Sequence, residues 1–184
     1  ASEGYKRQDE EVAADESGEA PPCYPREQIR ELLIDAAQRY GWDPNLIMAQ
    51  AWQESSWRQD EVSWTGAVGV MQIKPSTARE KEIAIRDVVT RAEDNIHAGA
   101  KYLRFLANKY VNDPAVNEAN RVLMALSAYN AGPGNLRKFR ERARQNGLDP
   151  NKWFGNVETG AAAVIGQETV QYVGNIYKYY VVYS

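Results

Sequence analysis

The chain has little of what disulfides, metal sites and membrane spans require. It holds one cysteine, Cys23, and one histidine, His97. An internal disulfide and a zinc site built from several histidines are therefore both excluded, and we expect no metal or other cofactor. No apolar run approaches the roughly 18 residues that a transmembrane helix needs, so no membrane span is predicted.

The start of the chain differs in composition from the rest. Residues 1–20 carry seven acidic side chains against Lys6 and Arg7, whereas the whole chain has a net charge of −3. Residues 1–25 also contain few large apolar side chains, so we predict a disordered acidic linker or tail there. Residues 26–184 are long enough for one domain with a single core. This part is nearly neutral, which argues against a nucleic-acid partner.

No targeting signal is visible at the start of the chain. A basic segment followed by an apolar one, as in a signal peptide, does not occur there. The chain begins at Ala1, which suggests a mature form or a fragment. Export is neither indicated nor excluded by this stretch.

Helical patterns begin at Arg26. Apolar residues recur at the spacing of one helix face before Gly41: Ile29, Leu32, Leu33, Ala36, Ala37 and Tyr40. Asp43-Pro44 is a helix cap followed by proline, and it predicts a second helix running to Glu54. Residues 58–75 lack this helical periodicity, so we predict a loop or short strands there.

Further helices are expected over most of the remaining chain. Thr90 and Glu93 form a capping box for a helix reaching Tyr110, and Asp113-Pro114 should open another that ends near Asn130. A basic helix follows to Gly147, then a small-residue segment over 161–163 and a tyrosine-rich helix from about Thr169. The fold class is therefore mainly α, with one irregular lobe.

Glu54 is the first candidate for chemistry. It shares a mostly apolar helix face with Ile47, Gln50 and Ala51, close to the helix C-terminus. Burial and the negative end of the helix dipole should both raise the pKa of its carboxyl. A carboxylic acid that keeps its proton near neutral pH can donate it to a glycosidic oxygen. On spacing alone, a functionally idle glutamate at a frayed helix end is the stronger interpretation.

Two later segments carry polar groups at turns. In the segment 66–75, two glycines precede Met71 and Gln72, and the amide of Gln72 suits an N-acetyl group. Tyr129 and Asn130 put a phenol and an amide at a helix terminus. The alternatives are a glycine turn leading into a strand, a tyrosine in the core and an asparagine that ends a helix.

Four motifs in this order resemble the soluble type of lytic transglycosylase, whose fold is that of goose-type lysozyme. They are Glu54-Ser55, Gly66-x-x-Gly69-x-Met71-Gln72, Ala128-Tyr129-Asn130-Ala131-Gly132 and Glu168-Thr169-x-x-Tyr172-Val173. The likeness covers roughly Arg26 to Tyr183. The part after Gly147 is similar to the catalytic domain of the membrane-bound lytic murein transglycosylase F group. The resemblance implies a lysozyme-like helical domain with a small irregular or β lobe beside an active-site groove.

The resemblance also implies roles for single residues. Glu54 would be the general acid and then the base. Seven positions would bind the sugar: Ser55, Met71, Gln72, Tyr129, Asn130, Glu168 and Tyr172. The implied reaction cleaves the β-1,4 bond between N-acetylmuramic acid and N-acetylglucosamine and leaves a 1,6-anhydromuramyl end. The nearest other carboxylates, Asp60 and Glu61, read as solvated charges, so one carboxylate would serve both steps.

Several further expectations follow from the resemblance. The partner would be the glycan strand of peptidoglycan, and a solute-binding-like regulatory module would precede the domain in the full-length protein. We expect a monomer in the periplasm or cell envelope, in possible association with the outer membrane. Two other functions stay open: a goose-type-like hydrolase, in which water replaces the sugar hydroxyl, and a non-catalytic peptidoglycan-binding module.

The aromatic residues allow two interpretations. Trp57 and Trp64 lie close to the candidate acid in the sequence and could stack on sugar rings, whereas Trp52 is more typical of the core. The tyrosines near the C-terminus read as packing. The basic side chains over 137–144 are spread around their helix and read as a solvated face, with a weak attraction to anionic wall polymer as the alternative.

Overall fold

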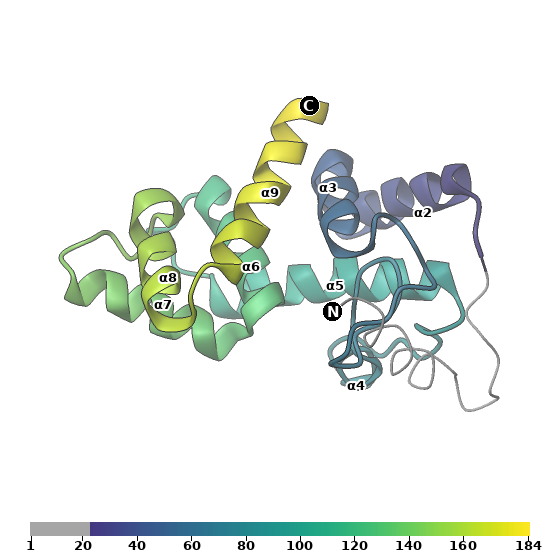
Figure 1. The fold of residues 1–184 in the computed structure, drawn as a ribbon, viewed down its shortest axis with the longest axis horizontal. Helices are drawn as coiled ribbons and strands as arrows, with labels where there is room; N and C mark the ends of the chain where they lie inside the picture. Colours follow the sequence, from purple (N-terminus) through teal and green to yellow (C-terminus); the bar gives the residue numbers. More distant parts are fainter. Residues whose placement is uncertain (1–22) are drawn as a thin grey trace, which may run out of the picture. The chain divides into compact units, whose positions relative to one another are not determined.

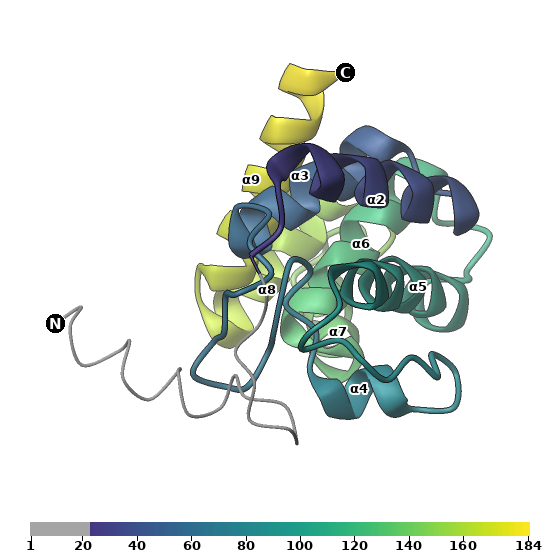
Figure 2. The same cartoon turned by 90° about the vertical axis from the view of Figure 1, so that its right-hand side faces the viewer.

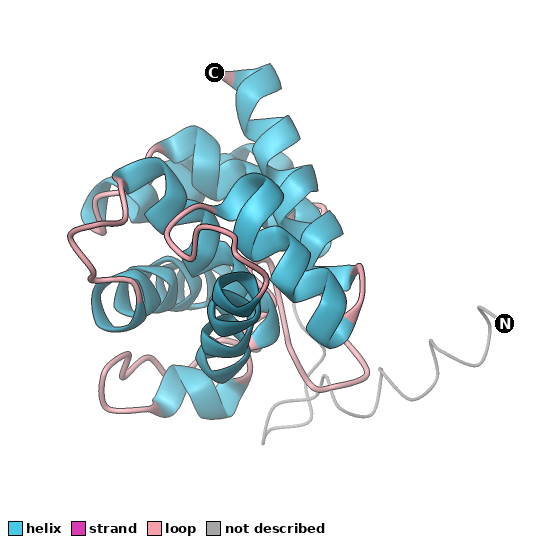
Figure 3. Cartoon of the chain, turned by 90° about the vertical axis from the view of Figure 1, so that its left-hand side faces the viewer, coloured by secondary structure: helices cyan, strands magenta, loops and turns pink. Residues whose placement is uncertain are grey.

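The computed structural model describes residues 23–184, which form helices joined by loops (Figure 1, Figure 3). The helices of the described chain are α2 (Arg26–Arg39), α3 (Pro44–Ser55), α4 (Pro75–Arg79), α5 (Ala92–Tyr110), α6 (Glu118–Ala131), α7 (Pro133–Gln145), the π-helical turn η1 (Trp153–Val157), α8 (Glu158–Ile165) and α9 (Glu168–Tyr183). The prediction of a mainly α fold is confirmed.

The described chain divides into two compact units. The first unit runs to Tyr102 and takes in Tyr183–Ser184, and the second unit is Leu103–Val182. The sequence predicts one domain from residue 26 onward and gives no sign of this division. No helix among the described residues is long and apolar enough to cross a bilayer.

In the first unit, α2 and α3 lie side by side (Figure 1, Figure 2). Four residues of the predicted α2 stripe are buried, Ile29, Leu33, Ala36 and Ala37, and the other two, Leu32 and Tyr40, are half-buried. Asp43 caps α3 as predicted, and its Oδ1 accepts a hydrogen bond from the Asn45 N–H at 2.9 Å. Such a cap stabilises a helix by about 1 kcal/mol.

Tyr24 belongs to the folded body although it precedes the expected boundary at residue 26. Its hydroxyl donates to the Thr90 carbonyl at 3.1 Å and accepts from the Ala92 N–H at 3.3 Å. Cys23, beside it, is exposed. The predicted disorder of residues 1–22 lies outside the described residues.

The loop between α3 and α4 contains two isolated antiparallel bridges, Val62 with Val68 and Val68 with Ile73. This agrees with the expected loop or short strands. The sequence does not predict α4, which begins at Pro75. A proline suits the first position of a helix, where no N–H partner is needed, so Pro75 starts an element there.

Two predicted helix starts differ from the structure, the first by one residue and the second by four. Helix α5 begins at Ala92, so Thr90 is not the residue before it, and the Thr90 carbonyl instead binds Tyr24. Helix α6 begins at Glu118, where the Asn117 side chain accepts from the Asn120 N–H at 2.9 Å. Asp113 accepts from the Ala115 N–H at 2.9 Å and so forms a local turn. Aspartate before proline makes such turns without a helix following.

In the second unit, α7 and α8 pack against each other (Figure 1). A Cβ atom added at Gly160 would lie 2.2 Å from the Phe139 carbonyl oxygen, so the two backbones approach closely there. The sequence predicts only a small-residue segment at this place. Small side chains permit this approach, which is why the segment is a packed helix.

Helix α9 buries one face, formed by Thr169, Tyr172, Val173 and Ile176. The expectation that the C-terminal tyrosines pack in the interior is wrong for Tyr177 and Tyr183, which are both exposed. Position 183 is seven residues after Ile176 and keeps the spacing of the buried face, but it lies in the last turn of α9, where Val181 and Val182 are exposed as well. Position 177 lies at the edge of that face.

Candidate active site

Glu54 lies in the last turn of α3, one residue before the helix ends. The residues that share its face, Ile47, Gln50 and Ala51, are buried, and Glu54 itself is half-buried. This confirms the predicted placement on the interior side. The negative end of the helix dipole disfavours the ionised carboxylate form of a glutamate at this position.

The chain leaves α3 through two residues in the left-handed region, Ser56 at φ 53° and Trp57 at φ 65°. The Ser56 N–H donates to the Trp52 carbonyl at 3.0 Å and closes the helix. Each such non-glycine residue costs about 1–2 kcal/mol, so surrounding contacts must hold the turn. The Trp57 indole N–H supplies one of them, donating to the Met48 carbonyl at 3.0 Å.

The neighbouring carboxylates are engaged elsewhere. Asp60 and Glu61 both pair with the Arg58 guanidinium, at 3.2 Å and 3.3 Å. Hydrogen bonding to Asp60 is the largest cause that raises the pKa of Arg58. The side chains of Asp60 and Glu61 are 50% and 42% exposed. These groups match the prediction of solvated charges, which leaves Glu54 as the candidate acid in this segment.

Ser55 attaches the end of α3 to the following loop. Its hydroxyl is buried, donates to the Val70 carbonyl at 2.7 Å and accepts from the Arg58 N–H at 3.1 Å. The resemblance assigns Ser55 to the wall of a sugar site. That contact stays a prediction, whereas the hydrogen bonds give Ser55 a role in holding the loop beside Glu54.

Replacing Ser55 with alanine should lower the free energy of unfolding by about 1–3 kcal/mol, because the buried Val70 carbonyl loses its donor. Urea unfolding of the variant and the parent measures this difference. Ser76→Ala, at an exposed position of α4, is the matched control and should change stability little. Equal effects of the two variants would contradict the assigned role.

Two buried polar residues that the sequence reasoning missed hold the loop from the other side. The Asn95 amide accepts from the Met71 N–H at 2.8 Å and donates to the Val68 and Val88 carbonyls at 2.8 Å and 2.9 Å. Gln59 donates to the Val88 and Val89 carbonyls at 2.9 Å each and accepts from the Val70 N–H at 3.2 Å.

A sequence signal for Asn95 exists but is weak. Asn95 and Gly99 are four residues apart and so lie on one face of α5, where both are poor helix formers. The loop packs on this face. Gln59 offers no comparable signal, because its carbonyl and N–H partners at 88, 89 and 70 are distant in sequence.

Met71 is fully buried against α5. A Cβ atom added at Gly99 would lie 2.4 Å from the Met71 Cβ, so the absence of a side chain at Gly99 makes room for it. The predicted contact of Met71 with a sugar would require the side chain to leave this position. Met71 supports the loop from within.

Gln72 has a left-handed backbone, at φ 48°. Its amide nitrogen donates to the Glu61 and Gly69 carbonyls at 3.0 Å each, and the side chain is half-buried. The amide therefore ties the two arms of the loop together. The first unit thus holds four of the predicted site residues: Glu54, Ser55, Met71 and Gln72.

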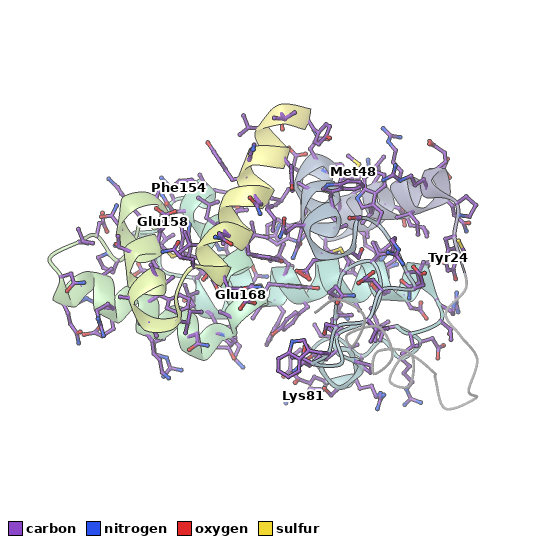
Figure 4. All side chains as sticks on the ribbon, in the orientation of Figure 1. Tyr24, Met48, Lys81, Phe154, Glu158 and Glu168 are labelled. Atoms are coloured by element: carbon purple, nitrogen blue, oxygen red, sulfur yellow. The ribbon has the colours of Figure 1, made fainter. Side chains whose placement is uncertain are left out.

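The second unit holds the other four predicted residues. Thr169 donates to the Asn130 side-chain oxygen at 2.7 Å, so the end of α6 meets the start of α9. Glu168 is the exposed first residue of α9 (Figure 4), and Tyr172 is buried one turn later. Tyr129, beside Asn130, is half-buried. The structure therefore joins the third and fourth sequence motifs.

The basic residues of α7 are less dispersed than predicted. Arg137, Arg140 and Arg144 line one pocket of the second unit, together with Asp113 and Glu141. Arg140 donates to the Pro150 carbonyl at 2.9 Å and to Asn151 at 2.8 Å, and Arg144 pairs with Glu141. The charges of Arg140 and Arg144 are thus used within the unit.

The chain belongs to the family of the transglycosylase SLT domain, whose model matches residues 31–153. It is 36% identical over 166 residues to membrane-bound lytic murein transglycosylase F 1 of Alkalilimnicola ehrlichii, covering 83% of this chain and 33% of that protein. The corresponding protein of Desulfosudis oleivorans is 33% identical over 168 residues, covering 83% of this chain and 36% of the relative. The chain therefore spans about a third of these relatives.

Solved structures share the fold. An inactive mutant of the lytic transglycosylase Slt of Pseudomonas aeruginosa matches with a TM-score of 0.60 and 28% identity, covering 84% of this chain and 23% of that one. The 70 kDa soluble lytic transglycosylase of Escherichia coli matches with a TM-score of 0.60 and 27% identity, covering 83% and 23%. The predicted mainly α, lysozyme-like fold class is confirmed.

Proposed function

We propose that the chain is a lytic transglycosylase that cuts the glycan strand of peptidoglycan, with Glu54 as its acid and then its base. The observation that carries the proposal is a half-buried carboxyl at a helix C-terminus, in a chain of the transglycosylase SLT family. The names of the relatives, which are lytic murein transglycosylases, support murein as the substrate.

In the first step, the Glu54 carboxyl protonates the oxygen that links N-acetylmuramic acid to N-acetylglucosamine. The bond from the muramyl C1 to that oxygen breaks, and the N-acetylglucosamine leaves with a free 4-hydroxyl. The acetamido oxygen of the muramyl residue supports the positive charge that develops at C1. A second carboxylate, as most glycosidases use, is not required by this route.

In the second step, the 6-hydroxyl of the same muramyl residue attacks C1, and the Glu54 carboxylate accepts its proton. A 1,6-anhydro ring forms, no water is consumed, and Glu54 is again protonated. An attacking group within the substrate gains from proximity and needs no bound water. The ion pairs of Asp60 and Glu61 with Arg58 support a mechanism with one working carboxylate.

Of the remaining predicted residues, we propose that Gln72, Tyr129, Asn130 and Glu168 contact the glycan directly. The buried residues Ser55, Met71 and Tyr172 are proposed to shape its site from the interior. Gln72 and Tyr129 are half-buried and Glu168 is exposed, so a ligand can reach each of them. We also infer that the domain works as a monomer in the periplasm or cell envelope. A preceding solute-binding-like module in a longer protein is part of the same proposal.

The products distinguish this function from hydrolysis. Purified peptidoglycan sacculi digested with the chain should release muropeptides one water lighter than those made by a lysozyme, as measured by mass spectrometry. Products carrying the added water would instead establish the hydrolase. Release of no muropeptide by a folded chain would favour the non-catalytic binding module.

A further inference from the structure

We infer that Trp64 is a stacking platform for a sugar ring of the glycan strand, a role that rests on the proposed function. The chain has five tryptophans. Trp64 is 72% exposed and is the most exposed large hydrophobic residue of the described chain. Tryptophan is enriched at binding interfaces, because its ring offers a large apolar face together with a polar N–H that can meet water or a ligand.

The structure separates Trp64 from the other tryptophans. Trp42 and Trp153 are buried, and the Trp42 indole donates to the Ala100 carbonyl at 3.0 Å. Trp57 lies edge-on to Trp52, with ring centroids 6.2 Å apart. Arg26 in turn lies over the Trp52 ring at 5.0 Å. These four rings are accounted for by packing or hydrogen bonds.

Trp64 has no such contact among the described residues, although its backbone is held firmly. The turn that carries it closes with a hydrogen bond from the Gly66 N–H to the Ser63 carbonyl at 3.0 Å. The Ala67 N–H donates to the Ser63 hydroxyl at 3.0 Å, and the Ser63 N–H donates to the Ala67 carbonyl at 2.9 Å. Thr65 also belongs to the turn, and its hydroxyl shares a hydrogen bond with the Ser63 hydroxyl at 2.8 Å.

The same turn is continuous with the loop that follows Glu54. Val62 and Val68, at the base of the turn, are buried and bridge each other. Val68 also bridges Ile73 and accepts from Asn95, which fixes the turn to α5. A ring carried by a rigid turn loses little conformational entropy on binding. Less of the contact free energy is then offset, and the affinity is higher.

A pyranose ring is the ligand that this presentation suits. The carbon-bound hydrogens of a sugar form an apolar face with positive character, and the face of an indole ring is negative. The indole N–H adds one donor for a hydroxyl or acetamido oxygen. Truncation of such an exposed tryptophan anchor in an interface costs about tenfold or more in affinity.

The test uses an isotope-labelled Glu54→Gln chain, which does not cut the ligand, and a stem-peptide-free tetrasaccharide of alternating N-acetylglucosamine and N-acetylmuramic acid. The Trp64 indole N–H signal, assigned by its loss in Trp64→Phe, should shift on titration. Trp64→Ala should raise the Kd about tenfold, and Trp64→Phe should raise it less. Tyr183→Ala, at an aromatic residue of similar exposure (69%), is the matched control and should bind as the parent does.

A second measurement, the rate of sacculus digestion by chains that keep Glu54, separates this inference from the proposed function. Trp64→Ala should raise KM about tenfold with kcat unchanged, because stacking binds ground state and transition state alike. Equal affinity and KM of Trp64→Ala and the parent would overturn the stacking role, even if the anhydro product forms. Binding that depends on Trp64 without any anhydro product would overturn the proposed function and leave the stacking role intact.

Discussion

Replacing Glu54 with glutamine should reduce release of 1,6-anhydromuropeptides from sacculi by about a thousandfold or more. Glutamine keeps the size and polarity of the side chain but cannot donate or accept the proton in either step. General acid–base catalysis by one side chain contributes about 10²–10⁴-fold, and here the same group serves two steps. The measurement is the initial rate of anhydro product formation by mass spectrometry.

The matched control is Glu82→Gln, a half-buried glutamate of the same unit whose nearest described partner is Lys81 at 4.0 Å. It should retain the parent rate. Both variants should unfold at the parent temperature, which shows that any loss is chemical. If Glu54→Gln kept the parent rate, the assignment of the acid would be wrong, whatever the products.

Replacing Gly69 with alanine should lower the free energy of unfolding by about 3–4 kcal/mol. Gly69 has φ +78°, and an added Cβ would lie 2.2 Å from the Asn95 Nδ2 and 2.6 Å from the Gln59 Oε1. The left-handed backbone costs about 1 kcal/mol for alanine, and overpacking costs a further 1–3 kcal/mol. Displacing the two amides would also break the bonds that hold the loop.

Gly66→Ala is the control that isolates the packing contribution. Gly66 has a similar backbone, φ +88°, but an added Cβ would meet nothing within 4 Å. This variant should therefore lower the free energy of unfolding by only about 1 kcal/mol. Thermal unfolding should place Gly69→Ala about 8–12 °C below the parent and Gly66→Ala about 2–4 °C below it. Similar melting temperatures for the two variants would mean that Gly69 is not closely packed.

The two glycines show what sequence reading could and could not supply. Both are visible as turn residues in the segment 66–75, and both do adopt a left-handed backbone. Only the structure separates the one that packs against Asn95 and Gln59 from the one in open space. The partners lie 26 and 10 residues away along the chain, beyond the reach of any local pattern.

The helix boundaries likewise show what local sequence can predict and what it cannot. The start of α3 was predictable because Asp43 and Pro44 act within their own turn. The start of α6 was misplaced, because Asp113 and Asn117 are both good helix caps and the local sequence cannot rank them. In the structure, Tyr24 engages the Thr90 carbonyl and Asn117 caps α6.

The sequence by itself determined that the protein is mainly helical, that Glu54 stands at the inner side of a helix end, and that four motifs follow in the order of this family. These properties depend on residues close together in the chain. Only the tertiary structure decided that Ser55, Gln59 and Asn95 hold the loop, that Met71 lies inside it and that Trp64 faces solvent. Burial and hydrogen-bond partners arise from contacts between distant segments, so no periodicity along the chain encodes them.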